Sequence, residues 1–213
     1  MDDSSKLESS GARDPSGNIY LSRSKVAAEQ RETRNGHMGG VVWLTGLSGA
    51  GKSTIAVELE HQLFKLGWHV YILDGDNMRR GLCSDLSFSP EDRTENIRRI
   101  GEMARMFADA GIVCIAAFIS PYRADRDLAR KLAPAGKFFE VYLNAPLEVC
   151  EKRDTKGLYA RARAGEIKDF TGISAPYEAP LNAEVELRTN ESTVAECVST
   201  VLKRLSKLLP AKS

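Results

Sequence analysis

One eight-residue segment constrains the fold of this chain more than any other. Residues 46–53 read Gly-Leu-Ser-Gly-Ala-Gly-Lys-Ser and fit the pattern G-x-x-x-x-G-K-[ST]. The segment lies between a hydrophobic run at 41–45 and an amphipathic stretch that begins at Lys52. A glycine-rich turn between a strand and a helix lets backbone N–H groups converge on a phosphate at the positive end of the helix. The pattern therefore predicts a strand–loop–helix unit that binds nucleotide phosphates.

The lysine and serine that close this segment have the roles expected at the triphosphate of a nucleotide such as ATP. Lys52 places a positive charge where it can bridge the β- and γ-phosphates, and the Ser53 hydroxyl suits the Mg²⁺ that accompanies ATP. A glycine-rich turn that only tightens a strand-to-helix connection would need neither residue. The residues expected to contact ATP are Gly46, Ser48, Gly49, Ala50, Gly51, Lys52, Ser53 and Thr54.

Short hydrophobic runs alternate with helical periodicity from Val41 onward, which is typical of βαβ units around a parallel sheet. Five buried strands are predicted, at 41–45, 69–73, 112–118, 138–143 and 184–187. Three helical stripes accompany them: Ile55, Leu59, Leu63 and Leu66; Ile97, Ile100, Ala104 and Phe107; and Val194, Cys197, Val201 and Leu205. We therefore expect an α/β fold of the P-loop kinase type, with a five-stranded parallel sheet, helices on both faces and a basic lid segment.

The composition fits one domain with a leading extension. With 213 residues, 42% of them hydrophobic, the chain can bury one core. Residues 1–37 are rich in Ser, Asp, Arg, Lys and Gly, which predicts a flexible or partly docked extension before a domain at 38–213. The four cysteines are far apart and form no C-x-x-C pair, so we expect free, buried thiols.

Charge and hydropathy argue against nucleic acid and membrane partners. Thirty basic and 29 acidic residues leave a net charge of +1, so no global field attracts a polyanion. No apolar run reaches the roughly 18 residues that a membrane-spanning helix needs, and the acidic start differs from a targeting peptide. We expect a cytoplasmic protein whose anion sites are local.

A phosphate loop alone does not distinguish a kinase from a GTPase or a transporter, so the rest of the chain must decide. The N-K-x-D and D-x-x-G motifs of a GTPase do not occur at matching places, and the run 112–118 lacks a terminal Asp. Another carboxylate must therefore serve near the metal. We take Ser53 and Asp74 as the metal ligands, although the sequence leaves open whether Asp74 or Asp76 approaches the ion.

The second predicted strand ends in Asp74-Gly-Asp76-Asn77-Met78-Arg79, at the sheet edge where open α/β folds bind ligands. Asp76 could position or deprotonate an attacking hydroxyl there, while Arg79 pairs with an anion of the acceptor. The alternative is an Asp-Gly turn whose charges are only solvated.

Two later segments add cations to this acceptor side. Arg93 continues the core-facing stripe of its helix, and Asn96 follows three residues later, so both could reach one ligand; an internal ion pair or a solvated first turn is the alternative. Ser89 is the expected N-cap of this helix, with Asp92 as its capping-box partner. Residues 153–177 are basic and glycine-rich, which predicts a lid rather than only a solvated basic loop.

Taken together, these segments resemble the adenylylsulfate (APS) kinases, which phosphorylate the 3′-hydroxyl of adenosine 5′-phosphosulfate with ATP. The resemblance runs from about residue 18 to 187. The motifs that carry it are GLSGAGKST at 46–54, LDGDNMRRGL at 73–82, FSPEDRTENIRRIGE at 88–102, FISPYR at 118–123 and KGLYARARAGEIKDFTGI at 156–173.

The resemblance implies a role for particular residues. Asp76 and Lys52 would act in catalysis, and the position of Ser120 is the one assigned in this family to a phosphoserine intermediate. Because in-line transfer needs no covalent step and no base adjoins Ser120 in the sequence, we expect a ligand contact there. Phe88 and Phe170 would stack on the adenine. The residues implied to bind the substrate are Asp76, Arg79, Phe88, Arg93, Asn96, Ile119, Ser120, Lys156, Asp169 and Phe170.

The resemblance also implies partners. A homodimer is expected, and a place in sulfate assimilation, with APS supplied by a separate ATP sulfurylase because no sulfurylase domain is present. The alternatives are a P-loop kinase for a nucleoside monophosphate or a sugar acid, and a catalytically weak nucleotide-binding module. The aromatic pair with Arg79 and Arg93 favours a nucleotide anion, and the presence of Lys52, Ser53 and Asp76 favours an enzyme.

Overall fold

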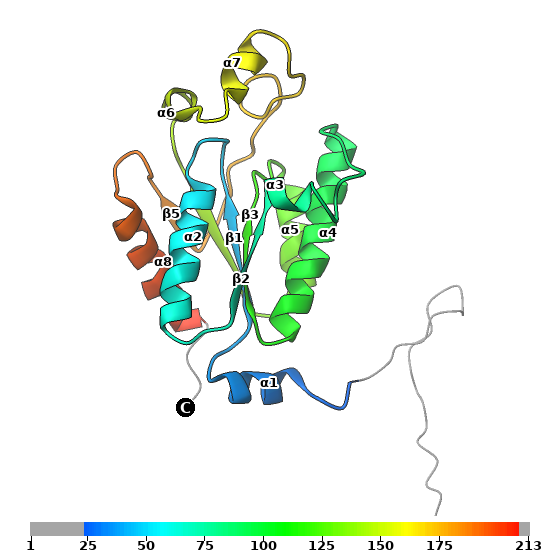
Figure 1. The fold of residues 1–213 in the computed structure, drawn as a ribbon, viewed down its shortest axis with the longest axis vertical. Coiled ribbons are helices and arrows are strands. Elements are labelled where there is room, and N and C mark those ends of the chain that lie inside the picture. The colour runs from blue at the N-terminus through cyan, green and yellow to red at the C-terminus, as the bar shows by residue number, and fades with distance from the viewer. Residues whose placement is uncertain (1–23, 209–213) are drawn as a thin grey trace, which may run out of the picture.

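The computed structural model describes residues 24–208, and Figure 1 shows their arrangement around one parallel sheet. The strand order is β2-β3-β1-β4-β5, so the strand that precedes the phosphate loop lies in the centre. The five predicted strands and the α/β class are confirmed, with bounds shifted by at most one residue. The strands are β1 (Gly40–Thr45), β2 (Val70–Asp74), β3 (Val113–Ala117), β4 (Phe138–Leu143) and β5 (Val185–Leu187).

Helices cover both faces of the sheet, as expected from the sequence. In Figure 1, α2 and α8 lie on one face, and α4 and α5 lie on the other. The helices are α1 (Ala28–Asn35), α2 (Lys52–Lys65), α3 (Gly75–Met78), α4 (Pro90–Asp109), α5 (Arg123–Leu132), α6 (Leu147–Arg153), α7 (Leu158–Arg163) and α8 (Val194–Leu208). No helix within residues 24–208 is long and apolar enough to cross a membrane.

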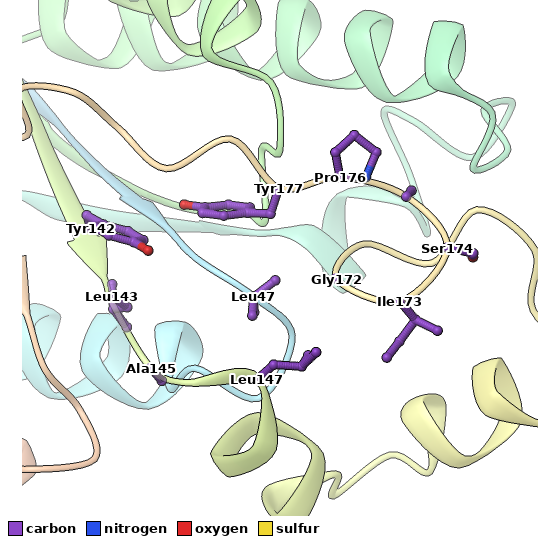
Figure 2. Close-up of a pocket in the computed structure, with 11 residues that line it drawn as sticks. Leu47, Tyr142, Leu143, Ala145, Leu147, Gly172, Ile173, Ser174, Pro176 and Tyr177 are labelled. Atoms are coloured by element: carbon purple, nitrogen blue, oxygen red, sulfur yellow. The ribbon is translucent and has the colours of Figure 1, made fainter.

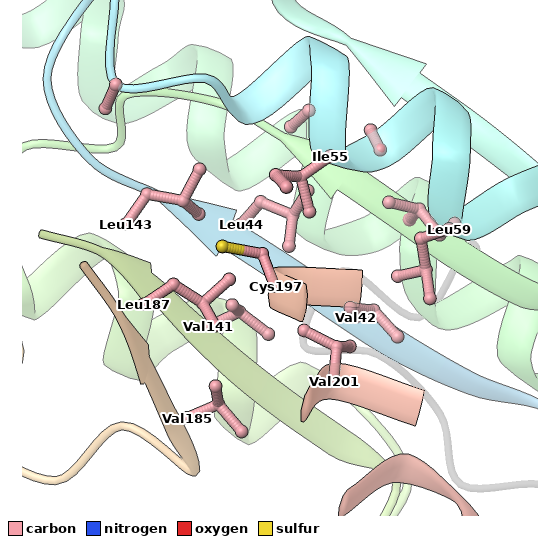
Figure 3. Close-up of a cluster of buried hydrophobic side chains, with 14 of the residues drawn as sticks. Val42, Leu44, Ile55, Leu59, Val141, Leu143, Val185, Leu187, Cys197 and Val201 are labelled. Atoms are coloured by element: carbon pink, nitrogen blue, oxygen red, sulfur yellow. The ribbon is translucent and has the colours of Figure 1, made fainter. Parts of the chain in front are cut away.

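The central strand β1 is buried on both faces because its side chains alternate between two hydrophobic clusters. Val42 and Leu44 pack with α2 and α8, in the cluster that Figure 3 shows. Val41 and Trp43 pack on the other face with residues of α4 and α5. Burying a side chain such as Leu44 contributes about 1.5–3 kcal/mol, so both layers hold β1, and with it the start of the phosphate loop.

Two predicted stripe positions are wrong. Leu66 is 65% exposed because α2 ends at Lys65, and Leu66 caps the helix beyond its contact with the sheet. Val194 is 40% exposed because it is the first residue of α8, and the buried face of that helix begins at Cys197. The prediction of free, buried cysteines is confirmed for all four.

The start of α4 agrees with the sequence in its cap and differs in its second contact. Ser89 Oγ accepts a hydrogen bond from the Asp92 N–H at 3.2 Å, and Pro90 occupies the first turn. The predicted capping box does not form, because the Asp92 carboxylate accepts from the backbone N–H of Ser87 at 2.9 Å. Asp92 therefore fixes the loop before the helix.

Part of the predicted extension is folded against the sheet. Helix α1 lies at the lower end of the sheet in Figure 1. Its Glu32 is buried, pairs with Lys137 at 2.6 Å and accepts from the Gly39 N–H at 3.0 Å. Residues 1–23 of the extension lie outside the described residues.

A buried histidine follows α1. The His37 ring stacks on Trp68 with 5.1 Å between centroids, and its Nε2 accepts from the His69 N–H at 2.9 Å. Burial lowers the pKa of His37 below its usual value. The folded protein therefore holds this ring in its neutral form.

This geometry predicts a pH-dependent loss of stability. Because the pKa of His37 is lower in the folded state than the 6.5 of a free histidine, the unfolded chain binds the proton more tightly. The stabilisation is complete above pH 6.5 and is lost as the pH falls toward the folded pKa. Relative to His37→Gln, the unfolding free energy of the wild type should fall by up to about 1.4 kcal/mol per pH unit.

Urea unfolding between pH 5 and 8 measures this difference. His61→Gln is the matched control, because His61 lies on the exposed side of α2. Parallel pH profiles for the wild type and His37→Gln would contradict the prediction.

Candidate active site

The loop that follows β1 needs glycine at two positions where the backbone passes close to a neighbour. Gly46 has φ +152°, and a Cβ there would lie 2.6 Å from the Leu143 carbonyl oxygen. Gly49 has φ +74°, and a Cβ there would lie 2.8 Å from the Cys150 carbonyl oxygen. Both contacts exclude a side chain. The first glycine of the motif and the additional Gly49 are therefore required for steric reasons in this fold.

The carbonyl groups of this loop are held by donors from other parts of the chain. The carbonyls of residues 46 and 47 accept from Lys52 Nζ at 2.9 and 2.8 Å. The next three accept from Tyr159 Oη at 2.9 Å, Arg153 Nη1 at 3.3 Å and Thr189 Oγ1 at 2.9 Å. These bonds fix the peptide orientations, which is what a loop that binds phosphate with its N–H groups requires.

The Lys52 side chain is folded back onto the loop in this structure. The hydrogen bonds of its ammonium group go to backbone carbonyls. Burial lowers the pKa of Lys52 to about 8, which nearby Asp74 and Asp76 oppose only in part. A lysine held in this way gains a stronger partner when an anionic phosphate enters the loop.

A chain of hydrogen bonds leads from the first turn of α2 to the acceptor side. Ser53 Oγ donates to Asp74 Oδ2 at 2.8 Å, and Asp74 Oδ1 accepts from the Asp76 N–H at 3.0 Å. The Asp76 carboxylate forms an ion pair with Lys156 of the predicted lid. The structure thus brings together Ser53, Asp74, Asp76 and Lys156, which come from α2, β2, α3 and the segment between α6 and α7.

The pair Ser53 and Asp74 fits a magnesium ion by its chemistry. Both groups are oxygen donors, and Mg²⁺ in kinases takes one or two protein oxygens together with phosphate oxygens and water. Asp74 ends β2, the neighbour of β3, so it provides a carboxylate at the sheet edge where β3 itself ends without one. The structure describes no cluster of three or more His, Cys, Asp or Glu side chains suited to a metal within residues 24–208.

Arg79 and Arg93, which were expected on the acceptor side, hold the loop before α4. Arg79 Nη1 donates to the Ser87 carbonyl at 2.8 Å, and its guanidinium lies 4.2 Å from the centroid of the Phe88 ring. Arg93 donates to the Phe88 carbonyl at 2.9 Å and to the Asp169 carbonyl at 2.6 Å. Burial lowers the pKa of both arginines below the usual value. Arg93 thus connects the loop before α4 to the lid.

Asn96 has a buried amide without a partner. The residue is 4% exposed, and its Nδ2 makes no hydrogen bond in the structure. A buried donor left unpaired costs about 1–3 kcal/mol. This donor is therefore suited to a ligand that the site receives.

The two aromatic residues expected to stack on a base are placed differently. Phe88 is 60% exposed, whereas Phe170 is 7% exposed and packs edge-on against Tyr159 with 5.0 Å between centroids. Their rings do not contact each other in the described chain, although Arg93 bridges their two segments.

Ser120 is buried and its hydroxyl is engaged. Its Oγ accepts from the Trp43 indole N–H at 3.1 Å, and the residue is 2% exposed with φ +40°. The neighbouring Ile119 carbonyl accepts from Thr45 Oγ1 at 2.7 Å. The segment after β3 is therefore fixed by β1, and the hydroxyl of Ser120 faces an indole rather than a base.

The predicted lid projects beyond the carboxyl edge of the sheet, at the top of Figure 1. The Asp154 carboxylate accepts from three consecutive backbone N–H groups, at residues 158–160, and so holds the start of α7. Arg161 pairs with Glu166, and Arg163 pairs with Glu151, so these two lid arginines bind acidic side chains on the lid and its base.

Two cavities border the phosphate loop. The first, of about 570 Å³, lies on the β4 side between Leu47, Tyr142, Leu147 and the returning lid segment 172–177, as Figure 2 shows. None of the residues expected to form the site lines it. The second, of about 450 Å³, is lined by Ser53, Thr54, Val57, Glu58 and Val194.

Sequence reasoning missed Tyr159 and Thr189, which hold the phosphate loop from outside. Thr189 follows β5 with no motif around it, and only the contact of its hydroxyl with the Ala50 carbonyl gives it a role. Tyr159 lies within the KGLY segment, and this motif could have indicated a role for it. The sequence cannot show that its hydroxyl reaches the Ser48 carbonyl.

Comparisons with known proteins agree with this geometry. The model of the adenylylsulphate kinase family matches residues 38–188. An adenylyl-sulfate kinase of Acaryochloris marina is 52% identical over 90% of this chain and 94% of its own length, and one of Staphylococcus haemolyticus is 56% identical over 89% and 96%. The structure of the Mycobacterium tuberculosis APS kinase in complex with AMPPNP and APS is 48% identical, with a TM-score of 0.76 over 79% of this chain and 98% of that chain. The predicted family is confirmed, and this chain belongs to the adenylylsulphate kinases.

Proposed function

We propose that this protein transfers the γ-phosphoryl group of ATP to the 3′-hydroxyl of adenosine 5′-phosphosulfate, which yields 3′-phosphoadenosine 5′-phosphosulfate and ADP. The observation that carries the proposal is the hydrogen-bond chain from Ser53 through Asp74 to Asp76. It joins the group that would face the γ-phosphate to the carboxylate that would face the acceptor. A nucleotide-binding module without activity would not need this connection.

On the ATP side, the N–H groups of residues 46–54 would surround the β-phosphate at the start of α2. Lys52 would leave the loop carbonyls and bridge the β- and γ-phosphates. The adenosine part would lie toward the cavity beside Ser53, Thr54 and Val194, which adjoins the first turns of α2.

Ser53 and Asp74 are the residues that would hold Mg²⁺. When bound, the ion would compensate the charge of the β- and γ-phosphate oxygens as the bond to the leaving oxygen weakens. The protein's own part is to place two oxygen donors 2.8 Å apart at the phosphate end of β2.

On the acceptor side, Asp76 is the proposed general base. The 3′-hydroxyl would give its proton to the Asp76 carboxylate while its oxygen forms the new bond to the γ-phosphorus, and ADP leaves with the electrons of the broken bond. Asp76 now pairs with Lys156. Binding of the acceptor would separate the pair, and Lys156 would then pair with an anion of the substrate.

The remaining acceptor contacts follow from burial and charge. Arg79 and Arg93 would face the phosphosulfate and ribose, and the unpaired Asn96 amide would donate to the same ligand. Phe88 is exposed and able to stack on the adenine, whereas Phe170 would have to turn from Tyr159 as the lid moves. Further contacts are proposed for Ile119, Ser120, Asp169 and Lys156.

In this proposal Ser120 contributes by its place in the site and forms no covalent phosphoserine intermediate. Its Oγ is buried and accepts from Trp43, so a phosphoryl group would have no path to it without movement of the loop. Direct in-line transfer requires no such intermediate.

Further properties complete the proposal. Residues 153–177 would close over both substrates and exclude water, and residues 1–37 would form an extension of which α1 is the docked part. We propose a homodimer in the cytoplasm that receives APS from a separate ATP sulfurylase, as expected for this family.

Acceptor-dependent turnover tests the proposed function. With ATP and Mg²⁺ alone, the enzyme should form little ADP. Once APS is added, turnover should be on the order of 1–100 s⁻¹. ADP and the 3′-phosphorylated nucleotide should form in equal amounts, measured by chromatography. ADP release that is unaffected by APS would discard the acceptor.

Substitution of the proposed base should affect chemistry more than nucleotide binding. Asp76→Asn should lower kcat by about 100- to 10,000-fold, because it removes the proton acceptor. The Kd for AMPPNP should change less than threefold. Asp127→Asn, which changes an exposed carboxylate on α5, is the control and should retain wild-type turnover. An unchanged kcat for Asp76→Asn would exclude the assigned role.

The lowered pKa of Lys52 predicts that ADP binding weakens at high pH. Because the protonated lysine binds phosphate, and its pKa in the free enzyme is about 8, affinity should be constant below pH 8. Above it, affinity should fall by up to about tenfold per pH unit. Titration calorimetry with ADP between pH 7 and 9.5 measures the effect.

Lys52→Arg is the matched control for that titration, because its guanidinium stays protonated throughout this range. Its affinity for ADP should be independent of pH. The same decline in both proteins would mean that another group titrates.

A further inference from the structure

Arg126 joins two loops of the active site from the buried face of α5. Its side chain is 2% exposed. Nη1 donates to the Ser120 carbonyl at 2.7 Å, Nη2 to the Glu178 carbonyl at 2.7 Å, and Nε to Glu140 Oε1 at 2.8 Å. One guanidinium thus bonds three separate segments, which are the loop after β3, the end of the lid and strand β4.

The first of these segments is held in a conformation that it would not adopt alone. Ser120 has φ +40°, in the left-handed region that a residue with a Cβ disfavours. Such a residue persists only where its surroundings determine its conformation. The bond from Arg126 to the Ser120 carbonyl is one such restraint, and the Trp43 indole supplies another.

The second segment is the point where the lid rejoins the domain. The Glu178 N–H donates to the Pro121 carbonyl at 2.9 Å, and its carboxylate accepts from the Arg123 N–H at 2.8 Å. Residues 120–123 and 177–179 therefore form one connected unit, and Arg126 lies beneath it. The Tyr177 ring is 5.8 Å from the Arg126 guanidinium.

The third contact explains why the residue is an arginine. Glu140 is 7% exposed and compensates the buried charge, with a second bond from Arg130 Nη2 at 3.2 Å. A planar guanidinium can donate in three fixed directions at once. A lysine keeps the charge at this place but cannot hold both carbonyls and the carboxylate in the same geometry.

We propose that Arg126 is a positioning residue for the acceptor, which sets the loop 119–122 and the downstream end of the lid relative to each other. The inference rests on the proposed function, because the acceptor that this geometry receives is APS. Arg126 does not touch the substrate and acts through the carbonyls of Ser120 and Glu178.

Arg126→Lys tests the proposal against Arg130→Lys as the matched control. Arg130 lies on the same helix as Arg126 and bonds Glu140 and Glu184, but it reaches neither loop. Arg126→Lys should raise the KM for APS by tenfold or more and leave the Kd for AMPPNP within threefold of the wild type. Arg130→Lys should change neither. Arg126→Gln, which keeps one amide NH₂ group without the charge, is measured in parallel in case the lysine variant folds poorly.

Hydrogen exchange gives a readout that does not depend on turnover. Amides of residues 119, 120, 122 and 177–179 should exchange at least tenfold faster in Arg126→Lys than in the wild type, while those of α2 keep their rates. A wild-type KM for APS in either folded Arg126 variant, or unchanged exchange in both loops, would overturn the proposal. So would an equal loss of APS and AMPPNP binding that follows the lowered Tm, because that result indicates only a structural role.

The same series separates this inference from the proposed function. If the wild type itself neither binds nor phosphorylates APS, the proposed function fails. If the wild type uses APS and a folded Arg126 variant uses it equally well, only the positioning role fails.

Discussion

The packing of β1 between two helical layers is the constraint on which the site depends. Its alternating side chains are buried on both faces, so the strand cannot shift without exposing one of the two clusters. Its carboxyl end carries the phosphate loop, and the Trp43 indole extends from the core to Ser120 in the loop after β3. The same strand thus positions groups on both sides of the proposed phosphoryl transfer.

Around this strand, polar contacts between segments far apart in the sequence set the geometry. The carbonyls of the phosphate loop are held by Tyr159, Arg153 and Thr189, which belong to the lid, its base and the loop after β5. The segment predicted to act as a lid is therefore hydrogen-bonded to the phosphate loop. On the proposed acceptor side, Arg93 and Arg126 make corresponding connections, so each proposed substrate site is bonded to the predicted lid or its downstream end.

Charged side chains in this fold hold parts of the protein in position, in addition to their proposed roles in binding. A buried ion pair such as Arg126 with Glu140 contributes little net stability, because desolvation offsets the attraction. The pair instead fixes the direction of the Arg126 guanidinium. Removal of one partner would leave a buried charge and loosen two loops. Lys52 and Asp76 are likewise paired within the protein in this structure, with backbone carbonyls and with Lys156. In the proposed reaction both pairs would exchange for substrate groups, which would compensate part of the cost of desolvating them.

The sequence by itself determined the α/β class, the five strands, the phosphate loop and the family, because these depend on local periodicity and on motifs with one physical solution. It also placed Asp74 and Asp76 at the sheet edge, since a strand end is a local feature. It erred at Leu66, at Val194 and in the partner of Asp92, where the end of an element decides exposure and bonding. Only the tertiary structure decided that Ser53 reaches Asp74 and that the Ser120 hydroxyl is buried against Trp43. It also decided that Arg126, three residues before the buried Ala129 in a charged helix, holds two loops. These contacts join residues distant in the chain, and local pattern carries no information about which distant groups will meet.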